Sequence, residues 1–167
     1  MPSEIEIRSA IVGQMTTALA AFTPAPLILD RDITGILESG AYSGLLDSGD
    51  PAKIHCWVVT QRSMLPVDIR QGGTLYELVY DLTQIYQYRS GSDLSNSVRD
   101  ASLERDAVIN AFKYASALPT ILMRAHVKPV EWPEGLIDRP EPITRGTARQ
   151  SRAILRANNF YGPIGCS

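Results

Sequence analysis

The chain has 167 residues, of which 44% are hydrophobic and 20% are charged, and its formal net charge is −2. This length suffices for one well-packed domain, and the composition excludes wholesale disorder and fibrous repeats. The apolar stretches are too short for a membrane-spanning helix, and the opening MPSEIEIR carries acidic residues where a signal peptide would be basic. Cys56 and Cys166 have neither disulfide-framework nor metal-ligand spacing and are interpreted as free thiols. We therefore expect a protein made in a reducing cytoplasm, with no membrane partner.

The N-terminal residues predict an amphipathic helix. Ser3 and Glu6 have the spacing of a capping box, and apolar residues then recur every three or four positions: Ile7, Ile11, Met15, Leu19 and Phe22. The helix must end before Pro24 and Pro26, because proline has no amide proton and restricts the residue before it. A short strand over Leu27–Asp30 is expected next, followed by a long connection over residues 31–53 with one or two short helical turns.

Two apolar segments and a tyrosine-rich one predict the central strands. Ile54–Thr60 and Met64–Arg70 indicate a hairpin-like pair, with Pro66 placing the second segment at an edge or a bulge. Residues 75–88 fit a strand or a helix. We favour a strand, because the Gly72-Gly73 pair precedes it and four tyrosines share one alternating face: Tyr76, Tyr80, Tyr86 and Tyr88.

A second helix is predicted from Ser97 to the Leu118-Pro119 pair. Its apolar stripe comprises Val98, Ala101, Val108, Phe112 and Ala115. The acidic residues around its start are expected to complement the helix dipole: Asp93, Asp100, Glu104 and Asp106. Ile121–Lys128 is interpreted as a strand, residues 129–142 as a proline-rich excursion with Trp132, and residues 144–160 as a strand or a helix. These elements predict an α+β fold with a mainly antiparallel sheet flanked by two principal helices.

The C-terminal residues differ from the rest of the chain in charge. Residues 144–167 hold four arginines and no acidic residue, so residues 1–143 carry a net charge of −6. We divide the chain into an α+β core over residues 1–143 and an arginine-bearing segment over residues 144–167, which is either part of the same domain or an interface arm. If the segment is helical, Arg149, Arg152 and Arg156 share one face. Such a face can be solvated, contact an acidic protein surface or bind nucleic-acid phosphates.

The sequence contains no motif that indicates catalysis, a cofactor or a metal. It lacks a G-x-S-x-G elbow, a phosphate-binding glycine loop, a G-x-G-x-x-G turn and an H-E-x-x-H helix. His55 and Cys56 are neighbours in a predicted strand, so their side chains point to opposite faces and cannot share a metal without distortion. His126 with His55 would make only a weak site. We therefore predict no catalytic residue, no metal site and no cofactor.

The order of the elements resembles a known family. The segments that carry the resemblance are an opening helix IEIRSAIVGQMTTAL, a central block with arginine and glycine before an alternating strand, and a late helix SLERDAVINAF followed by ALP. Over residues 4–119 this order resembles the tail terminator proteins of long-tailed bacteriophages. The C-terminal third departs from the family, because a proline-rich segment and the arginines stand where short strands are expected. The resemblance implies a tail-terminator-like fold and a hexameric ring that caps the tail tube, stops its polymerisation and docks to the head connector.

The resemblance also implies partners and surfaces. The partners would be further copies of the chain, the tail tube and sheath proteins, the head connector or adaptor, and packaged DNA in the ring lumen. The protein would be part of the virion, assembled in the host cytoplasm. Such a ring needs a heterologous contact between subunits and a tube-facing contact. Tyrosines can supply one surface, although the sheet core is an equal alternative for them: Tyr76, Tyr80, Tyr86 and Tyr88. Arginines can supply the other: Arg145, Arg149, Arg152 and Arg156.

Other functions stay open on the sequence alone. The near alternative is a head-to-tail adaptor or another minor tail protein. A different class is a small cytoplasmic enzyme whose site is assembled from scattered residues such as His55, Asp81 and His126. A further alternative is a nucleic-acid-binding accessory module that uses the basic C-terminal segment.

Overall fold

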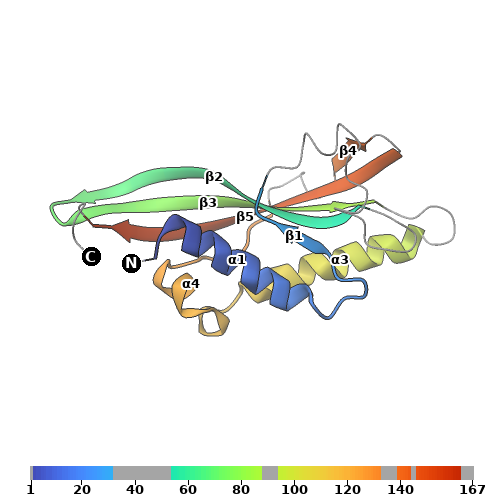
Figure 1. Ribbon diagram of the computed structural model, residues 1–167, viewed down its shortest axis with the longest axis horizontal. Helices are drawn as coiled ribbons and strands as arrows, with labels where there is room; N and C mark the ends of the chain where they lie inside the picture. The colour runs from blue at the N-terminus through green and yellow to red at the C-terminus, as the bar shows by residue number, and fades with distance from the viewer. Residues whose placement is uncertain (1, 32–53, 88–93, 133–138, 144–145, 163–167) are drawn as a thin grey trace.

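One mixed β-sheet with helices on one face makes up the molecule (Figure 1). The computed structural model describes residues 2–31, 54–87, 94–132, 139–143 and 146–162, with the backbone alone for 94–97, 115, 139–143 and 146–149. In chain order the elements are α1 (Glu4–Leu19), β1 (Leu27–Leu29), β2 (His55–Arg70), β3 (Gly73–Tyr86), α3 (Leu94–Ala111), the 3₁₀ turn η2 (Ala115–Ala117), α4 (Thr120–Arg124), β4 (Arg139–Ile143) and β5 (Gly146–Tyr161).

The strands lie in the order β1-β2-β3-β5-β4, and only the β1–β2 pair is parallel. The predicted α+β class, with a mainly antiparallel sheet and two principal helices, is therefore confirmed. None of the helices in the described ranges is long and apolar enough to cross a membrane.

Helix α1 forms as its sequence predicts. The backbone N–H of Glu6 donates to Ser3 Oγ at 3.2 Å, and the backbone N–H of Ser3 donates to Glu6 Oε2 at 2.6 Å, so both bonds of the capping box are present. The predicted apolar face is buried: Ile7, Ile11, Met15 and Leu19. The helix ends at Leu19, and Phe22 packs against the core from the turn that follows.

Strand β2 corrects the predicted pair of short strands. Both segments belong to one continuous strand, so the hairpin predicted between them is wrong. The register with β3 shifts between Gln61 and Ser63, where the two segments join, and again between Pro66 and Asp68, within the second segment, where a bulge at Pro66 was one of the two predicted options. The real hairpin joins β2 to β3 through Gln71 and Gly72.

Strand β3 confirms that residues 75–86 form a strand and not a helix. It pairs with β2 on one side and with β5 on the other, in an unbroken register from Thr74↔Tyr161 to Tyr86↔Arg149. The undecided segment over residues 144–160 is thus a strand along residues 146–161. Because β5 lies between β3 and β4, residues 146–161 of the arginine-bearing segment are an internal part of the sheet.

The segment after α3 corrects the predicted strand over Ile121–Lys128. Its first residues form the short helix α4, and Leu122 and Ala125, three positions apart, both enter the core. After α4 the chain runs along the outer edge of β5. The backbone N–H of Lys128 donates to Arg156 O at 2.9 Å, and Glu131 forms a bridge with Ile154. A five-residue helix is too short to show its periodicity in the sequence.

The core lies between the helices and one face of the sheet. Its largest fully buried side chains come mainly from α1, β2, β3, α4 and the residue that follows α3, and include Trp57, Tyr80, Phe112, Leu82 and Leu122. In Figure 1 the helices cover part of the sheet, and the β2–β3 hairpin extends beyond them at one end. This uneven cover divides the molecule into two regions, the helix-covered body and the hairpin end.

Candidate interaction surface

A buried carboxylate ties α3 to the sheet. Glu104 is 1% exposed, and its Oε2 pairs with His55 Nε2. Trp57 Nε1 donates to Glu104 Oε1 at 3.0 Å, and Gln84 Nε2 lies 3.4 Å from the same oxygen. The predicted role of Glu104 in complementing the helix dipole is therefore wrong, because its carboxylate lies mid-helix and accepts hydrogen bonds from β2 and β3. Asp93, from the same predicted set, lies outside the described residues.

The next residue of α3 extends this network to a third strand. Arg105 Nη1 donates to Ser151 Oγ of β5 at 2.9 Å and to Gln84 Oε1 at 3.3 Å. Its Nη2 donates to Ser102 Oγ at 2.9 Å. Gln84 and Ser151 are each 1% exposed. Glu104, Gln84 and Ser151 are buried, Arg105 and Ser102 are half-buried, and each is hydrogen-bonded to another member, so the cluster serves to dock α3 on the sheet.

The residues of the scattered enzyme site are not brought together. His55 is buried against Glu104, and Asp81 forms an ion pair with Arg62 at 2.6 Å. His126 is exposed and borders an open recess that neither His55 nor Asp81 lines. Within the described ranges, no three His, Cys, Asp or Glu side chains are grouped as metal ligands would be.

Cys56 is a buried free thiol, on the strand face opposite His55 and Trp57. Burial, and then the charge of Glu104, raise the pKa of Cys56 to about 12. A thiol that stays protonated is a poor nucleophile and a poor metal ligand. Cys166 lies outside the described residues.

The predicted tyrosine surface lies largely inside the molecule. Tyr80 is fully buried and Tyr86 is 6% exposed, so both rings belong to the core side of the sheet. Tyr76 is half-buried and packs edge-to-face on Tyr161, with the ring centroids 5.6 Å apart. Tyr88 lies outside the described residues. A contact surface on this protein must therefore be built mainly from other side chains.

The predicted arginines lie on a strand, so the expectation that three of them share a helical face is wrong. Arg152 and Arg156 are half-buried and, four positions apart on β5, share the face of the sheet away from the helices. Arg156 Nη1 pairs with Glu77 Oε1 at 3.1 Å, and its Nε with Glu131 Oε2 at 3.4 Å. The side chain of Arg149 and the whole of Arg145 lie outside the described residues.

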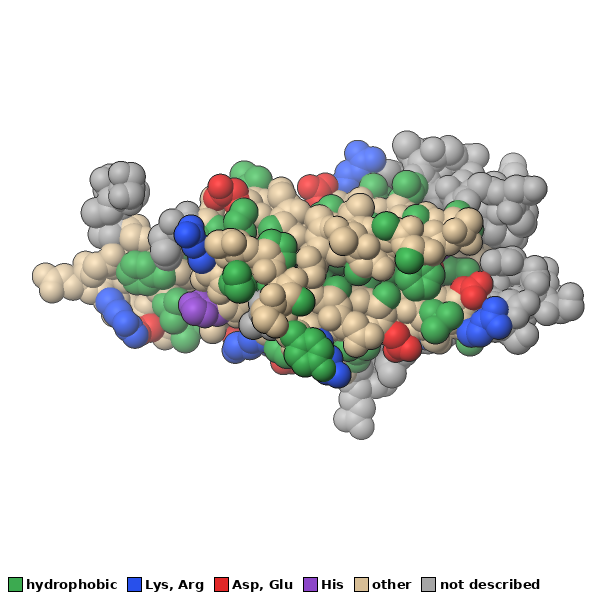
Figure 2. Space-filling view, turned by 90° about the horizontal axis from the view of Figure 1, so that it is seen from below, with side chains coloured by type: hydrophobic (Ala, Val, Ile, Leu, Met, Phe, Trp, Pro, Cys, Tyr) green, Lys and Arg blue, Asp and Glu red, His purple; other side chains and the backbone are tan. Residues whose placement is uncertain are grey.

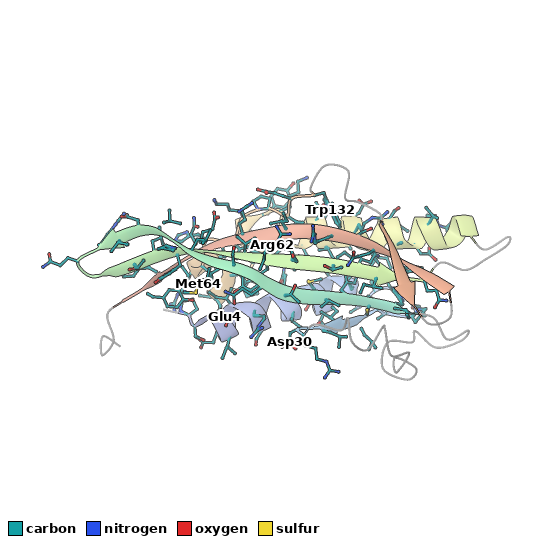
Figure 3. All side chains as sticks on the ribbon, turned by 90° about the horizontal axis from the view of Figure 1, so that it is seen from above. Glu4, Asp30, Arg62, Met64 and Trp132 are labelled. Carbon is teal, nitrogen blue, oxygen red and sulfur yellow. The ribbon has the colours of Figure 1, made fainter. Side chains whose placement is uncertain are left out.

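Figure 3 looks onto this outer face and labels Arg62 and Met64, where β2 leaves the body. Arg62 pairs with Asp81, and Lys128 joins Arg156 at Glu77, with Nζ 4.0 Å from Oε2. Paired charges at partly exposed positions contribute little net charge to a binding surface. Arg62 and Arg156 are thus held by carboxylates of the same molecule, which weakens the nucleic-acid alternative for these two side chains.

The hairpin end of the sheet carries a cluster of exposed apolar side chains. We define the arm as residues 63–77, the distal part of the β2–β3 hairpin. Leu65 is 56% exposed, Val67 59% and Ile69 77%, and Met64 is also exposed. These four residues stand within six consecutive positions, on the strand that forms the outer edge of the arm. Beyond Val58 that edge has no partner strand in the described part of the chain. By the register with β3, Met64 and Ile69 lie on one face of the arm and Leu65 on the other, so both faces of the arm expose apolar side chains and are a candidate contact surface.

An open recess of about 540 Å³ lies beside the base of the arm. Its walls come from the N-terminus and from α4 with its C-terminal turn: Pro2, Thr120, Met123, Arg124 and His126. Asn159 Nδ2 donates to Pro2 O at 2.8 Å, and Asn159 pairs with Tyr76 in the sheet, so the recess and the arm share one end of the molecule. In Figure 2 hydrophobic and basic side chains lie close together at that end.

Neither the burial of Glu104 nor the exposure of the arm was predictable from the sequence. Glu104 has the appearance of an ordinary exposed helix residue, and only the gap in the apolar stripe between Ala101 and Val108 could have suggested that it faces the sheet. For the arm, the sequence predicted only that Pro66 places the segment at an edge or a bulge, and the register with β3 shifts between Pro66 and Asp68. The exposure of the arm's apolar side chains, beyond the reach of every helix in the described part of the chain, identifies them as a surface.

Comparison with known proteins assigns no family. The chain matches no model of a protein family. It matches no curated protein either.

Proposed function

We propose that this protein is a structural subunit of the neck or tail of a long-tailed bacteriophage, and that it assembles into a ring that caps the tail tube and joins it to the head connector. The proposal begins from the resemblance of residues 4–119 to tail terminators. It assigns the protein to the virion, without catalytic activity or cofactor, and with copies of itself, the tail tube and the connector as partners.

The observation that carries the proposal is the arm. The arm exposes apolar side chains on an otherwise well-packed domain. Such a surface is typical of a subunit whose exposed apolar side chains become buried against other subunits in an assembly. The buried polar cluster around Glu104 supports the same proposal, because its side chains hold α3 on the sheet and thus have a structural role. The ion pairs of Arg156 further favour protein contacts over DNA contacts on the outer face.

The test is a stop codon in the gene for this chain, in the virus that encodes it. A tail terminator limits tube growth, so we expect headless tails of irregular and excessive length in electron micrographs of the lysate. A plasmid copy of the wild-type gene should restore tails of uniform length joined to heads. Tails of normal length in the mutant lysate would contradict the terminator function, and normal tails that fail to join heads would favour an adaptor instead.

A further inference from the structure

Buried polar side chains lie where the start of α1 meets the end of β5, and both chain ends are at this end of the molecule (Figure 1). Tyr80 is fully buried and Asn159 is 1% exposed. Alternate residues of β3 face the helices, so Tyr76 and Tyr80 share that face, and Asn159 lies opposite Tyr76 on β5. Within the described part of the chain, neither the Tyr80 hydroxyl nor Asn159 Oδ1 forms a hydrogen bond.

Two further oxygen atoms at this place are buried in the same way. Glu4 Oε1 and the Tyr161 hydroxyl also have no hydrogen-bond partner among the described residues. Arg8 Nε lies 3.6 Å from Glu4 Oε1, which is an ion-pair contact but is too long for a hydrogen bond. We call the four atoms the polar seam: Glu4 Oε1, Asn159 Oδ1 and the hydroxyls of Tyr80 and Tyr161.

Contacts on both sides of the polar seam show that its members are neighbours. Asn159 Nδ2 donates to Pro2 O at 2.8 Å, two residues before Glu4. The ring of Tyr161 packs on Tyr76, which is the sheet partner of Asn159. Burial raises the pKa of Tyr80, and the charges of Glu4 and Tyr161 raise it further. The phenol of Tyr80 therefore keeps its proton at neutral pH and can donate a hydrogen bond to an acceptor nearby.

The polar seam combines hydrogen-bond donors with acceptors. The hydroxyls of the two tyrosines can donate, whereas the carboxylate and amide oxygens only accept. Buried polar atoms are seldom left unpaired in folded proteins, and those without a protein partner usually bind ordered water, with about three hydrogen bonds to each water molecule. Because water both donates and accepts, it can join a hydroxyl to a carboxylate that the hydroxyl does not reach.

We infer that ordered water binds in the polar seam and bridges the Glu4 carboxylate to the Tyr80 hydroxyl, so that it holds the start of α1 on the sheet. The same water network serves Asn159 Oδ1 and the Tyr161 hydroxyl. The two principal helices are then docked in different ways, because α3 is held by direct bonds such as that between Trp57 and Glu104. This inference is independent of the proposed function, since it concerns the interior of one subunit.

The direct test is a crystal structure of the full chain at a resolution that shows single water molecules. We expect ordered water within hydrogen-bonding distance of both Glu4 Oε1 and the Tyr80 hydroxyl. A direct hydrogen bond between these two groups, or a polar seam without ordered water, would overturn the inference.

Removal of one hydroxyl tests the same site in solution. Tyr80→Phe keeps the ring and removes only the oxygen. If the hydroxyl is bonded to water and through it to Glu4, its loss should lower the urea midpoint of unfolding. An unchanged or higher midpoint would mean that the hydroxyl is unpaired, and would contradict the water bridge. Tyr114→Phe is the control, because Tyr114 is 61% exposed and should show no shift.

A double-mutant cycle tests whether Glu4 and Tyr80 are coupled. In a Glu4→Ala background, Tyr80→Phe should shift the urea midpoint by less than half of its shift in the parent, because the bridge is already broken. Glu4→Ala also removes the ion pair with Arg8, but this loss is common to both members of the comparison and cancels. Equal shifts in the two backgrounds would show that no water joins the two side chains.

Discussion

The two halves of β2 show how one strand serves first as core and then as surface. His55–Val59 is buried on both faces, whereas four apolar residues between Met64 and Ile69 are exposed. Both halves are rich in β-branched and apolar residues. The helices pack on one face of the body, and none of the helices in the described ranges reaches the arm (Figure 1). The same residue type therefore contributes to folding in one half and is available for assembly in the other.

The largest expected effect in the body comes from Glu104→Ala. It removes the acceptor of His55 and Trp57 and leaves their buried donors unpaired. We expect a loss of about 3–5 kcal/mol in the free energy of unfolding, measured by urea denaturation. Glu104→Gln keeps an oxygen acceptor for Trp57 and should lose clearly less. A loss below about 1 kcal/mol for the alanine variant would show that the cluster does not hold α3 on the sheet.

A leucine pair compares body and arm directly. Leu82 is fully buried and Leu65 is 56% exposed. Leu82→Ala should lower the free energy of unfolding by about 2–5 kcal/mol through lost burial and a cavity. Leu65→Ala should change it by no more than about 0.5 kcal/mol. Equal losses in urea denaturation would mean that the arm is part of the core and would remove the distinction between the two regions.

A substitution in the turn of the arm should have a smaller effect on stability, and the neighbouring glycine provides the control. Gly73 has φ 143°, and a Cβ built there would lie 2.3 Å from Tyr161 O. Gly73→Ala should therefore cost about 1–3 kcal/mol of unfolding free energy. Gly72 has no atom within 4 Å of the same position, so Gly72→Ala should be nearly neutral. Matching unfolding midpoints for the two variants would contradict the tight packing of β5 against the turn.

The smallest effect at neutral pH concerns Cys56. Its pKa is raised in the folded state from 9.0 to about 12, chiefly by burial, so the folded protein keeps the thiol proton that the unfolded chain loses. The stabilisation is complete below pH 9 and falls as pH rises from about 9 to about 12. Urea midpoints of Cys56→Ala and the parent, both with Cys166→Ser, should converge over that range. A constant difference between the two would refute the shift.

The elements set by neighbouring residues were predictable from the sequence. The capping box at Ser3 and Glu6 and the spacing of Ile7, Ile11 and Met15 lie within one helix, so α1 needs no distant contact to be identified. The glycine pair and the alternating tyrosines likewise identified β3. These patterns lie within one segment, so they can be recognised without knowledge of the tertiary contacts.

The features that depend on distant contacts were not predictable. The continuity of β2 through two bulges depends on its pairing with β3, and the helix at Thr120–Arg124 depends on a place in the core for Leu122. The role of Glu104 requires donors on two strands. The candidate surface depends on which part of the sheet the helices cover, a property that no single segment encodes.

The bulges of β2 have a consequence for how this protein meets others. An exposed edge strand with apolar side chains is a template for fibril growth, because any extended chain can add to it. Here the shifts at Gln61/Ser63 and Pro66/Asp68 interrupt the even ladder that an added strand would need, and at the opposite edge β4 carries Pro140 and Pro142. The addition of further strands is thus disfavoured at both edges of the sheet. The exposed apolar side chains of the arm remain accessible to a partner with a complementary surface.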